Sequence, residues 1–231
     1  MKIAIMGAMV EEIEPLLEFL GDYEMNEVAG NRYYSGEYKG LELVIAYSKI
    51  GKVFASLTAS TMIEKFDAKM LLFSGVAGAI NPNLKIGDLI VATKLCQHDL
   101  DITAFGHPFG YVPEGKVFVE SSKELQELSK DVAKDLGKDL KQGIIATGDQ
   151  FVANQERKEW IGKTFGADAL EMEGASVAVV CDALDVPFFI LRSISDSADM
   201  DAGFSFDEFL KSSAKESAEF VISMLDKLAK K

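Results

Sequence analysis

Three carboxylates in this chain of 231 residues each follow a short apolar run that is typical of a β-strand: Glu12, Glu173 and Asp196. In open α/β sheets, ligands bind beyond the carboxyl ends of the strands. We therefore expect the three side chains to converge on one edge of a sheet, with the ring of Phe151 beside them. Carboxyl groups that meet in one cleft can donate and accept protons, so acid–base chemistry is the first function to consider.

Glu12 departs from the amphipathic pattern of its own helix, which is predicted over residues 10–20. The apolar stripe of this helix includes Ile13 and Leu16, and Glu12 lies beside that stripe rather than on the polar face. This position favours a role in a site. A second explanation stays open, because acidic residues also stabilise a helix N-terminus through its dipole. Asp196 has a similar alternative, as an aspartate that closes a turn or caps a helix.

Alternating strand and helix patterns must position these residues. The predicted strands are residues 2–6, 32–38, 41–47, 70–73, 89–92, 143–146, 169–172 and 188–193. The predicted helices are residues 10–20, 53–65, 121–136, 154–165, 174–184 and 205–228. This order predicts an α/β fold with a central mixed, mostly parallel sheet flanked by helices. We expect one domain over residues 1–231, with an early hairpin formed by the second and third strands.

Four further features of the sequence lead to structural expectations. The glycine-rich segment 74–79 is predicted to be a turn that either ends a strand or lets a ligand approach the backbone. Phe151 belongs either to the core or to the site. Phe204 and Phe206 either cover a pocket or form a hydrophobic staple for the last helix. Arg192 stands in a strand with a buried pattern, so it needs a carboxylate partner, and a glutamate is expected.

The acidic composition argues against several classes of function. Lys and Arg number 24 against 37 Asp and Glu, and the net charge of −13 repels nucleic acids and anionic lipids. We expect neither a membrane span nor a signal peptide, because no apolar run and no N-terminal pattern fits one. Two well-separated cysteines, Cys96 and Cys181, indicate reduced thiols and a cytoplasmic protein. Small molecules or protein partners are therefore the expected ligands.

The sequence points to neither a metal nor a cofactor. Residues 98–101 (HDLD) look like a metal-ligand cluster, but no further cysteine or histidine stands at ligand spacing. The chain has no phosphate-binding glycine motif and no nucleophile elbow. The least regular segment, residues 97–113, is a long loop of the kind that is often functional.

Eight segments together resemble one family. They are GAMVEEI (7–13), SKIGKV (48–53), FSGVAGA (73–79), DITAFGHPFGYVP (101–113), TGDQFV (147–152), EMEGASVA (171–178), RSISDSAD (192–199) and SFDEFL (205–210). The chain resembles the 5'-methylthioadenosine/S-adenosylhomocysteine nucleosidases of the nucleoside phosphorylase superfamily, nearly from end to end. The resemblance implies a nucleoside phosphorylase-like domain, a homodimer, and hydrolysis of the N-glycosidic bond of 5'-substituted adenosines.

The resemblance also implies a role for each carboxylate. Asp196 would be the general acid that protonates N7 of adenine, and Glu12 would be the base that activates the attacking water. Glu173 would bind the ribose 2'- and 3'-hydroxyls. An acid at N7 removes the charge of the departing adenine, and ionised carboxylates stabilise an oxocarbenium-like sugar. Asp196 must then be protonated near neutral pH, while Glu12 must stay ionised with the help of the nearby Arg192.

Other residues would form the substrate site. Phe151 would stack on adenine, the Val152 backbone would read its edge, and Met172 would pack under the sugar. Ala77 and Gly78 would line the sugar and water region, and Met9, Ile50 and Phe206 would surround the 5' substituent. The remaining implied substrate contacts are Arg192 and Ser195, and Phe105, His107 and Pro113 from the neighbouring subunit. The chain departs from the family at two positions. Val76 replaces a hydroxyl residue near the reacting water, so other groups must hold that water. His107 replaces an aromatic residue, which leaves the 5' preference open, and the role of Glu171 is also open.

The substrate range and the reaction class each have alternatives. The candidates are 5'-methylthioadenosine, S-adenosylhomocysteine, 5'-deoxyadenosine and 6-amino-6-deoxyfutalosine, an adenine nucleoside of menaquinone biosynthesis. A nucleoside phosphorylase is the first rival. Phosphate binding would be expected to use arginine side chains in the early loops, but no arginine precedes Arg32. The second rival, a nucleoside-binding protein without activity, would not need both Glu12 and Asp196.

Overall fold

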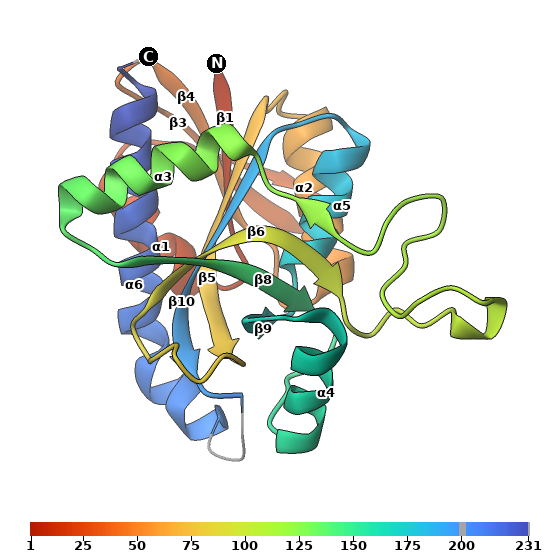
Figure 1. Ribbon diagram of the computed structural model, residues 1–231. Helices are drawn as coiled ribbons and strands as arrows, with labels where there is room; N and C mark the ends of the chain where they lie inside the picture. The colour runs from red at the N-terminus through yellow and green to blue at the C-terminus, as the bar shows by residue number, and fades with distance from the viewer. Residues whose placement is uncertain (199–201, 231) are drawn as a thin grey trace.

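The computed structural model describes residues 1–198 and 202–230 as an α/β structure in which helices flank a mixed sheet (Figure 1). The strands are β1 Lys2–Gly7, β2 Glu24–Val28, β3 Asn31–Tyr38, β4 Leu41–Tyr47, β5 Met70–Ala79, β6 Leu89–Gln97, β7 Val119–Glu120, β8 Leu140–Thr147, β9 Ala169–Glu171 and β10 Phe188–Asp196. The helices are α1 Val10–Leu20, α2 Lys52–Glu64, the 3-10 turn η1 Thr103–Phe105, α3 Lys123–Leu136, α4 Gln155–Phe165, α5 Gly174–Ala183 and α6 Ala202–Leu228.

The sheet runs in the order β10-β6-β8-β9-β5-β1-β4-β3-β2, and β7 pairs with β6. The predicted hairpin is confirmed as the antiparallel pair β3 and β4. The expected mixed, mostly parallel sheet is confirmed, because its longest pairings, β10 with β5 and β6 with β8, are parallel. Among the described strands, five pairings are parallel and five are antiparallel.

One end of the sheet closes on itself. Strand β10 pairs in parallel with β5 and antiparallel with β6, and β8 and β9 complete the circuit back to β5. In this register, Gly78 of β5 is the partner of both Leu170 on β9 and Asp196 on β10. The closure therefore brings the ends of β5, β9 and β10 together, and with them the segments that carry Glu173 and Asp196.

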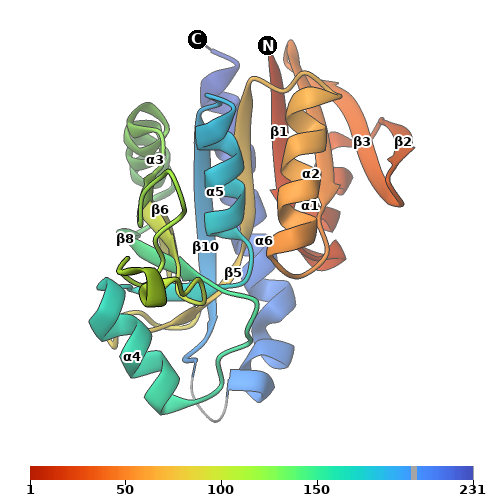
Figure 2. The same ribbon diagram turned by 90° about the vertical axis from the view of Figure 1, so that its right-hand side faces the viewer.

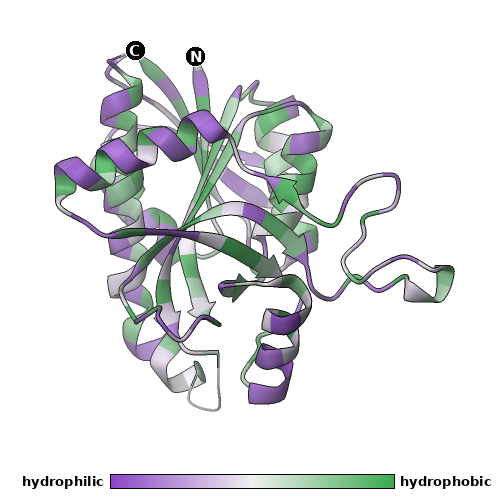
Figure 3. Cartoon of the chain, in the orientation of Figure 1, coloured by the Kyte–Doolittle hydropathy of each residue, from purple (hydrophilic) through white to green (hydrophobic). Residues whose placement is uncertain are grey.

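Helices cover both faces of the sheet. Helices α2 and α5 lie side by side on one face, and α6 lies on the other with α1 and α3 beside it (Figures 1 and 2). Hydrophobic residues gather where these helices meet the strands, whereas the outer surfaces of α3 and α4 are hydrophilic (Figure 3). Helix α5 is largely buried, with Ala175, Val177, Ala178 and Cys181 in the core. Burial of these apolar faces is the main force that assembles the layers.

Several boundaries differ from those expected from the sequence. The glycine-rich segment 74–79 is the second half of strand β5, so the prediction of a turn there is wrong. Its small residues allow the backbones of neighbouring strands to approach closely. Strand β10 also continues through Asp196, and β6 continues to Gln97. The sequence patterns missed the two short or exposed strands, β2 and β7, because neither has an apolar run.

The segment between β6 and β7 projects away from the body of the molecule and contains η1 (Figure 1). Within the described ranges, no helix combines the length and the apolar character that crossing a membrane requires. Helix α6 begins at Ala202, three residues earlier than expected, so Phe204 belongs to its first turn rather than to a preceding loop, and Phe206 lies in the helix as predicted. The side chain of Phe204 lies outside the described part of the structure.

Candidate active site

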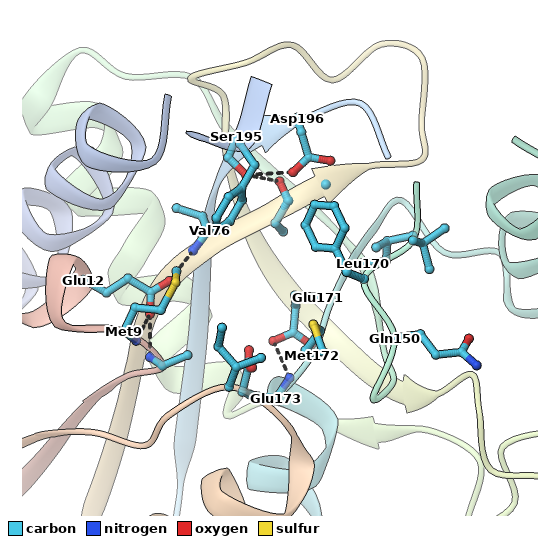
Figure 4. A pocket seen from close by; sticks show the side chains of 17 residues that line it. Met9, Glu12, Val76, Gln150, Leu170, Glu171, Met172, Glu173, Ser195 and Asp196 are labelled. Atoms are coloured by element: carbon cyan, nitrogen blue, oxygen red, sulfur yellow. Dashed lines mark hydrogen bonds between the residues drawn. The ribbon is translucent and has the colours of Figure 1, made fainter. Parts of the chain in front are cut away.

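A cavity of about 350 Å³ opens at the ends of β1, β5, β9 and β10 (Figure 4). Its polar groups include the three carboxylates singled out above, which lie on different sides of the open space. The following predicted site residues line it: Met9, Glu12, Ile50, Ala77, Gly78, Phe151, Val152, Met172, Glu173, Ser195, Asp196 and Phe206. Five further lining residues had not been predicted as site residues: Ala8, Val76, Gln150, Leu170 and Glu171.

Glu12 is held by backbone donors in the first turn of α1. Its carboxylate accepts hydrogen bonds from the N–H groups of Ala8 at 2.5 Å, Met9 at 3.1 Å and Val76 at 3.1 Å. The side chain is buried, and burial raises the pKa of Glu12 above its ordinary value, while the Arg192 charge and the three N–H groups oppose the rise. Glu12 is thus a rigidly oriented carboxyl group with more basic character than a surface glutamate.

Strand β5 makes room for this carboxylate through Gly75. A Cβ atom on Gly75 would lie 2.7 Å from Oε1 of Glu12, closer than atoms can approach. The glycine-rich segment therefore has a function that neither of its sequence interpretations named. It lets a buried carboxylate lie against a strand backbone.

Asp196 lies at the irregular end of β10, where the pairing with β5 shifts register after Ile194. Its carboxyl group accepts hydrogen bonds from the Ser195 hydroxyl at 2.9 Å and from the Ala198 N–H at 2.8 Å. The second contact is the turn-closing role that the sequence left as an alternative. Asp196 also lines the cavity and is only 4% exposed, so the structural role and the place in the site coexist.

Glu173 stands at the N-terminus of α5 and reaches across to the loop before α2. Its Oε1 accepts a hydrogen bond from the Gly51 N–H at 2.8 Å. Burial, together with the negative charge of the nearby Glu171, raises the pKa of Glu173 to about 8. A ligand hydroxyl that donates a hydrogen bond to this carboxyl group would therefore stabilise its ionised form.

Glu171 and Arg192 form a buried ion pair beneath this part of the cavity. Nη2 of Arg192 lies 2.7 Å from Oε2 of Glu171, and both side chains are almost fully buried. The expectation of a glutamate partner for Arg192 is confirmed. However, Arg192 does not line the cavity, because its guanidinium is engaged by Glu171 and by the carbonyls of Phe73 and Leu191. Arg192 therefore supports the site from behind the cavity, through Glu171, instead of contacting the substrate as predicted.

Glu171 also organises the start of α5. It accepts hydrogen bonds from the N–H groups of Gly174 at 2.7 Å and Glu173 at 3.3 Å, and from the Thr147 hydroxyl. An acidic side chain on the free N–H groups of a helix is a stabilising arrangement. In the sequence, Glu171 was visible only as one of two carboxylates that flank Met172. Its contacts show that it stabilises the start of α5.

Two aromatic rings border the cavity. The centroids of Phe151 and Phe206 are 5.7 Å apart, and the rings meet nearly edge to face. Phe151 is 50% exposed, so its interpretation as a core residue is wrong. An exposed aromatic face next to carboxylates suits a flat, polar-edged ligand such as a nucleobase.

Comparison with known proteins identifies the family of this fold. The sequence profile of the phosphorylase superfamily matches residues 2–226. The chain belongs to the phosphorylase superfamily. The resemblance seen in the sequence motifs is thereby confirmed, since the superfamily covers nearly the whole chain and its relatives include nucleosidases.

Individual relatives of this phosphorylase-superfamily chain are similar over their full lengths. An aminodeoxyfutalosine nucleosidase of Campylobacter jejuni is 60% identical over 228 residues, covering 99% of this chain and 100% of the relative. A 5'-methylthioadenosine/S-adenosylhomocysteine nucleosidase of Actinobacillus succinogenes is 38% identical over 99% of this chain and 100% of its own length. A crystal structure of the Helicobacter pylori 5'-methylthioadenosine/S-adenosylhomocysteine nucleosidase superposes with a TM-score of 0.97 at 53% identity, covering 98% of each chain.

Three predicted residues of this superfamily member lie outside its cavity. Phe105, His107 and Pro113 are exposed on the projecting segment, and the His107 ring stacks on Tyr111 at 4.5 Å. They do not reach the site of their own chain. Their predicted role depends on a second subunit.

The histidine–aspartate cluster at residues 98–101 is engaged in other contacts. His98 is buried, and burial lowers its pKa to about 4, while Nδ1 lies 3.1 Å from Nη2 of Arg157. Asp99 pairs with Lys52, and Asp101 accepts hydrogen bonds from Thr103. Within residues 1–198 and 202–230, no group of three or more acidic, histidine or cysteine side chains is arranged to hold a metal ion.

Proposed function

We propose that this chain is a hydrolase that cleaves the N-glycosidic bond of 5'-substituted adenosines to adenine and the free sugar. The proposed substrates are 5'-methylthioadenosine, S-adenosylhomocysteine, 5'-deoxyadenosine and 6-amino-6-deoxyfutalosine. The observation that carries the proposal is the convergence of Glu12, Glu173 and Asp196 on one cavity that an exposed Phe151 borders. The 60% identity to an aminodeoxyfutalosine nucleosidase supports the inclusion of the futalosine derivative.

In the proposed reaction, Asp196 donates a proton to N7 of adenine as the bond between C1' and N9 breaks. The Ser195 hydroxyl, 2.9 Å from Oδ2 of Asp196, supports the position of this carboxyl group. The bonding electrons stay with adenine, which leaves as a neutral base because of the added proton. General acid catalysis of this kind contributes roughly 10²–10⁴-fold to a rate.

Glu12 accepts a proton from the water that attacks C1', so the new C1'–O bond completes hydrolysis. Three N–H donors fix its carboxylate, and the buried position makes it more basic than an exposed glutamate. Because the donors come from Ala8, Met9 and Val76, the base needs no side-chain partner to hold it. The chain can therefore hold its proposed base in place although residue 76 is a valine rather than a hydroxyl residue.

Glu173 accepts hydrogen bonds from the ribose 2'- and 3'-hydroxyls, and Met172 packs under the sugar. Such hydrogen bonds favour the ionised carboxylate, whose charge then stabilises an oxocarbenium-like sugar. Phe151 stacks on adenine, and the Val152 backbone reads its edge. Ala77 and Gly78 border the sugar, and Met9, Ile50 and Phe206 border the 5' substituent.

Water rather than phosphate is the proposed nucleophile. Among the described residues that line the cavity, no side chain is a lysine or an arginine, and Glu12 adds negative charge. The guanidinium of Arg192 does not line the cavity and is paired with Glu171. A phosphate dianion would meet repulsion in this site, whereas a water molecule would meet a base.

We also propose that the protein acts as a homodimer. Four apolar residues before and along α2 are exposed: Ile50, Val53, Phe54 and Leu57. Ile50 also lines the cavity, and Phe105 on the projecting segment is 81% exposed. Exposed apolar surface of this kind is typical of an interface. In the dimer, Phe105, His107 and Pro113 of one subunit would border the 5' substituent bound by the other.

Two further features of the molecule belong to the same proposal. One sheet with core residues on both faces supports a single domain over residues 1–231. The thiols of Cys96 and Cys181 are free and buried, which supports a cytoplasmic location.

Adenine release with three substrates in parallel tests the proposed reaction. 5'-Methylthioadenosine, S-adenosylhomocysteine and 6-amino-6-deoxyfutalosine are incubated with the protein, each with and without phosphate. We expect release of adenine that does not depend on phosphate, with the free sugar as the second product. Formation of a ribose 1-phosphate would show a phosphorylase, and tight binding without turnover would show a binding protein.

A further inference from the structure

Lys52 and Asp99 form an ion pair just outside the lining of the cavity. Nζ of Lys52 lies 2.7 Å from Oδ1 of Asp99, and the two side chains are only 18% and 15% exposed. The same ammonium group donates to Oε1 of Gln97 at 3.0 Å. A largely buried pair of this kind is unlike the exposed ion pairs of the surface, because removal of one partner leaves a poorly solvated charge.

Asp149 closes a ring of contacts with this pair. Its N–H donates to the second oxygen of Asp99 at 2.8 Å, and its own Oδ1 accepts the backbone N–H of Lys52 at 2.8 Å. We call Lys52, Asp99 and Asp149 the clamp. It joins three segments far apart in the sequence: the first residue of α2, the segment that follows β6, and the loop after β8.

The clamp is continuous with the cavity on two sides. Gly51 precedes Lys52, and its N–H holds Oε1 of Glu173 at 2.8 Å. On the other side, Gln150, Phe151 and Val152 follow Asp149 directly and line the cavity. A Cβ on Gly51 would lie 3.0 Å from Oδ1 of Asp149, so the two loops touch without space for a side chain. The positive φ of 102° at Gly51 also favours glycine there.

We propose that Lys52 and Asp99 are positioning residues, which set the separation of the Gly51 loop from the Phe151 loop and so orient Glu173 and Phe151 for the substrate. This role rests on the proposed function, in which Glu173 binds ribose and Phe151 binds adenine. Neither Lys52 nor Asp99 lines the cavity, so both act through the loops that they join. Asp99 also opens the projecting segment, so the clamp anchors the base of that segment as well.

Steady-state adenine release from 5'-methylthioadenosine tests the clamp with Lys52→Met, Asp99→Asn and the double variant. We expect KM to rise about 10-fold while kcat changes less than about threefold, because positioning of the ground state is lost and the acid and base remain. The double variant should resemble the single variants, since both remove the same interaction. Lys52→Arg, which keeps the charge, should restore KM to near the wild-type value.

The matched control is the exposed pair Lys69 and Asp67, whose side chains are 61% and 77% exposed. Lys69→Met should leave KM and kcat unchanged. A lower melting temperature of the clamp variants with an unchanged KM would overturn the proposal, because it would show a purely structural pair.

Hydrogen exchange separates the clamp from the proposed reaction. In Asp99→Asn, the amides of residues 48–52 and 148–153 should exchange at least about tenfold faster than in the wild type, and those of α3 should not change. Unchanged exchange in both loops would overturn the clamp even if adenine is released. If the wild-type protein releases no adenine from any of the three nucleosides, the proposed function fails, and with it the role of the clamp in that reaction.

Discussion

Gly78 of β5 faces Asp196 of β10 so closely that a Cβ on Gly78 would lie 2.6 Å from Oδ1 of Asp196. Three residues earlier, Gly75 stands in the same relationship to Glu12. Each proposed catalytic carboxyl group therefore lies against a strand position that has no side chain. Two glycines of one strand, three residues apart, thus make room for the proposed base and the proposed acid.

Gly78→Ala should displace Asp196 and lower adenine release strongly. The added methyl group would have to push aside either the carboxyl group or Ala198, whose Cβ would lie 3.1 Å away. We expect kcat to fall at least about 100-fold, which is of the order of a lost general acid. Gly203→Ala is the control, because nothing lies within 4 Å of a Cβ at Gly203. An active Gly78→Ala enzyme would mean that Asp196 does not need its present position.

Asp196→Asn should abolish turnover while the site still binds a nucleoside. The amide cannot deliver a proton to N7, but it retains the size of the side chain, so a loss of about 10²–10⁴-fold in kcat is expected. Adenine release measures turnover, and calorimetry with 5'-methylthioadenosine measures binding. The control Asp226→Asn removes an exposed carboxylate that contacts Tyr38 and Lys39 far from the cavity. A wild-type rate in Asp196→Asn would exclude Asp196 as the acid.

Without ligand, the Glu173→Gln variant should become more stable relative to the wild type as the pH rises. The pKa of Glu173 is about 8 in the folded chain against an ordinary value of 4.5, so the folded state retains a proton that the unfolded state loses. The stabilising effect of that proton is fully present below about pH 4.5 and is lost as the pH rises towards 8.

Thermal unfolding of the two proteins from pH 5 to about pH 9.5 measures this effect on both sides of the folded pKa. Because glutamine cannot ionise, the melting temperature of the variant should gain on that of the wild type across this window. The gain should level off above the folded pKa. Parallel curves for the two proteins would contradict a raised pKa at Glu173. Ribose binding should be weaker in the variant, because glutamine is a weaker acceptor than a carboxylate.

Val53→Glu should dissociate the proposed dimer and weaken catalysis through the shared site. Val53 is 75% exposed on α2, close in sequence to Ile50 of the cavity, and a carboxylate would oppose burial there. Sedimentation of the wild type should give twice the chain mass, and the variant should give the single chain mass with a higher KM. Leu136→Glu, at the end of α3, is the matched control. A monomeric wild type with full activity would contradict the contribution of Phe105 from a neighbour.

The helix and strand patterns correctly identified most elements because each has a strong local signal. Helix α1 was recognised from its apolar stripe, and the unusual position of Glu12 beside that stripe led to a residue that lines the cavity. The end of α3 likewise agrees with the predicted position, at Leu136. These features depend on neighbours in the sequence, so periodicity and capping preferences are sufficient to find them.

Contacts between distant segments could not be read in this way. The glycines of segment 74–79 suggested a turn, and only the packing of β5 against β10 and α1 explains why a strand should carry them. Similarly, the role of Glu171 stayed open until Arg192, 21 residues away, was found beside it. Local periodicity carries no information about which strand pairs with which, nor about which charge a buried residue meets.

By itself, the sequence determined the class of fold, the family, and the set of residues from which a site is built, because these follow from local patterns and from motifs. The tertiary structure decided which members of that set share one cavity. It placed Arg192 behind the cavity and Phe151 at its border, and it set Glu12 and Asp196 against two glycines of one strand. The physical reason is that burial, hydrogen bonding and charge pairing at the site arise between segments that only folding brings together.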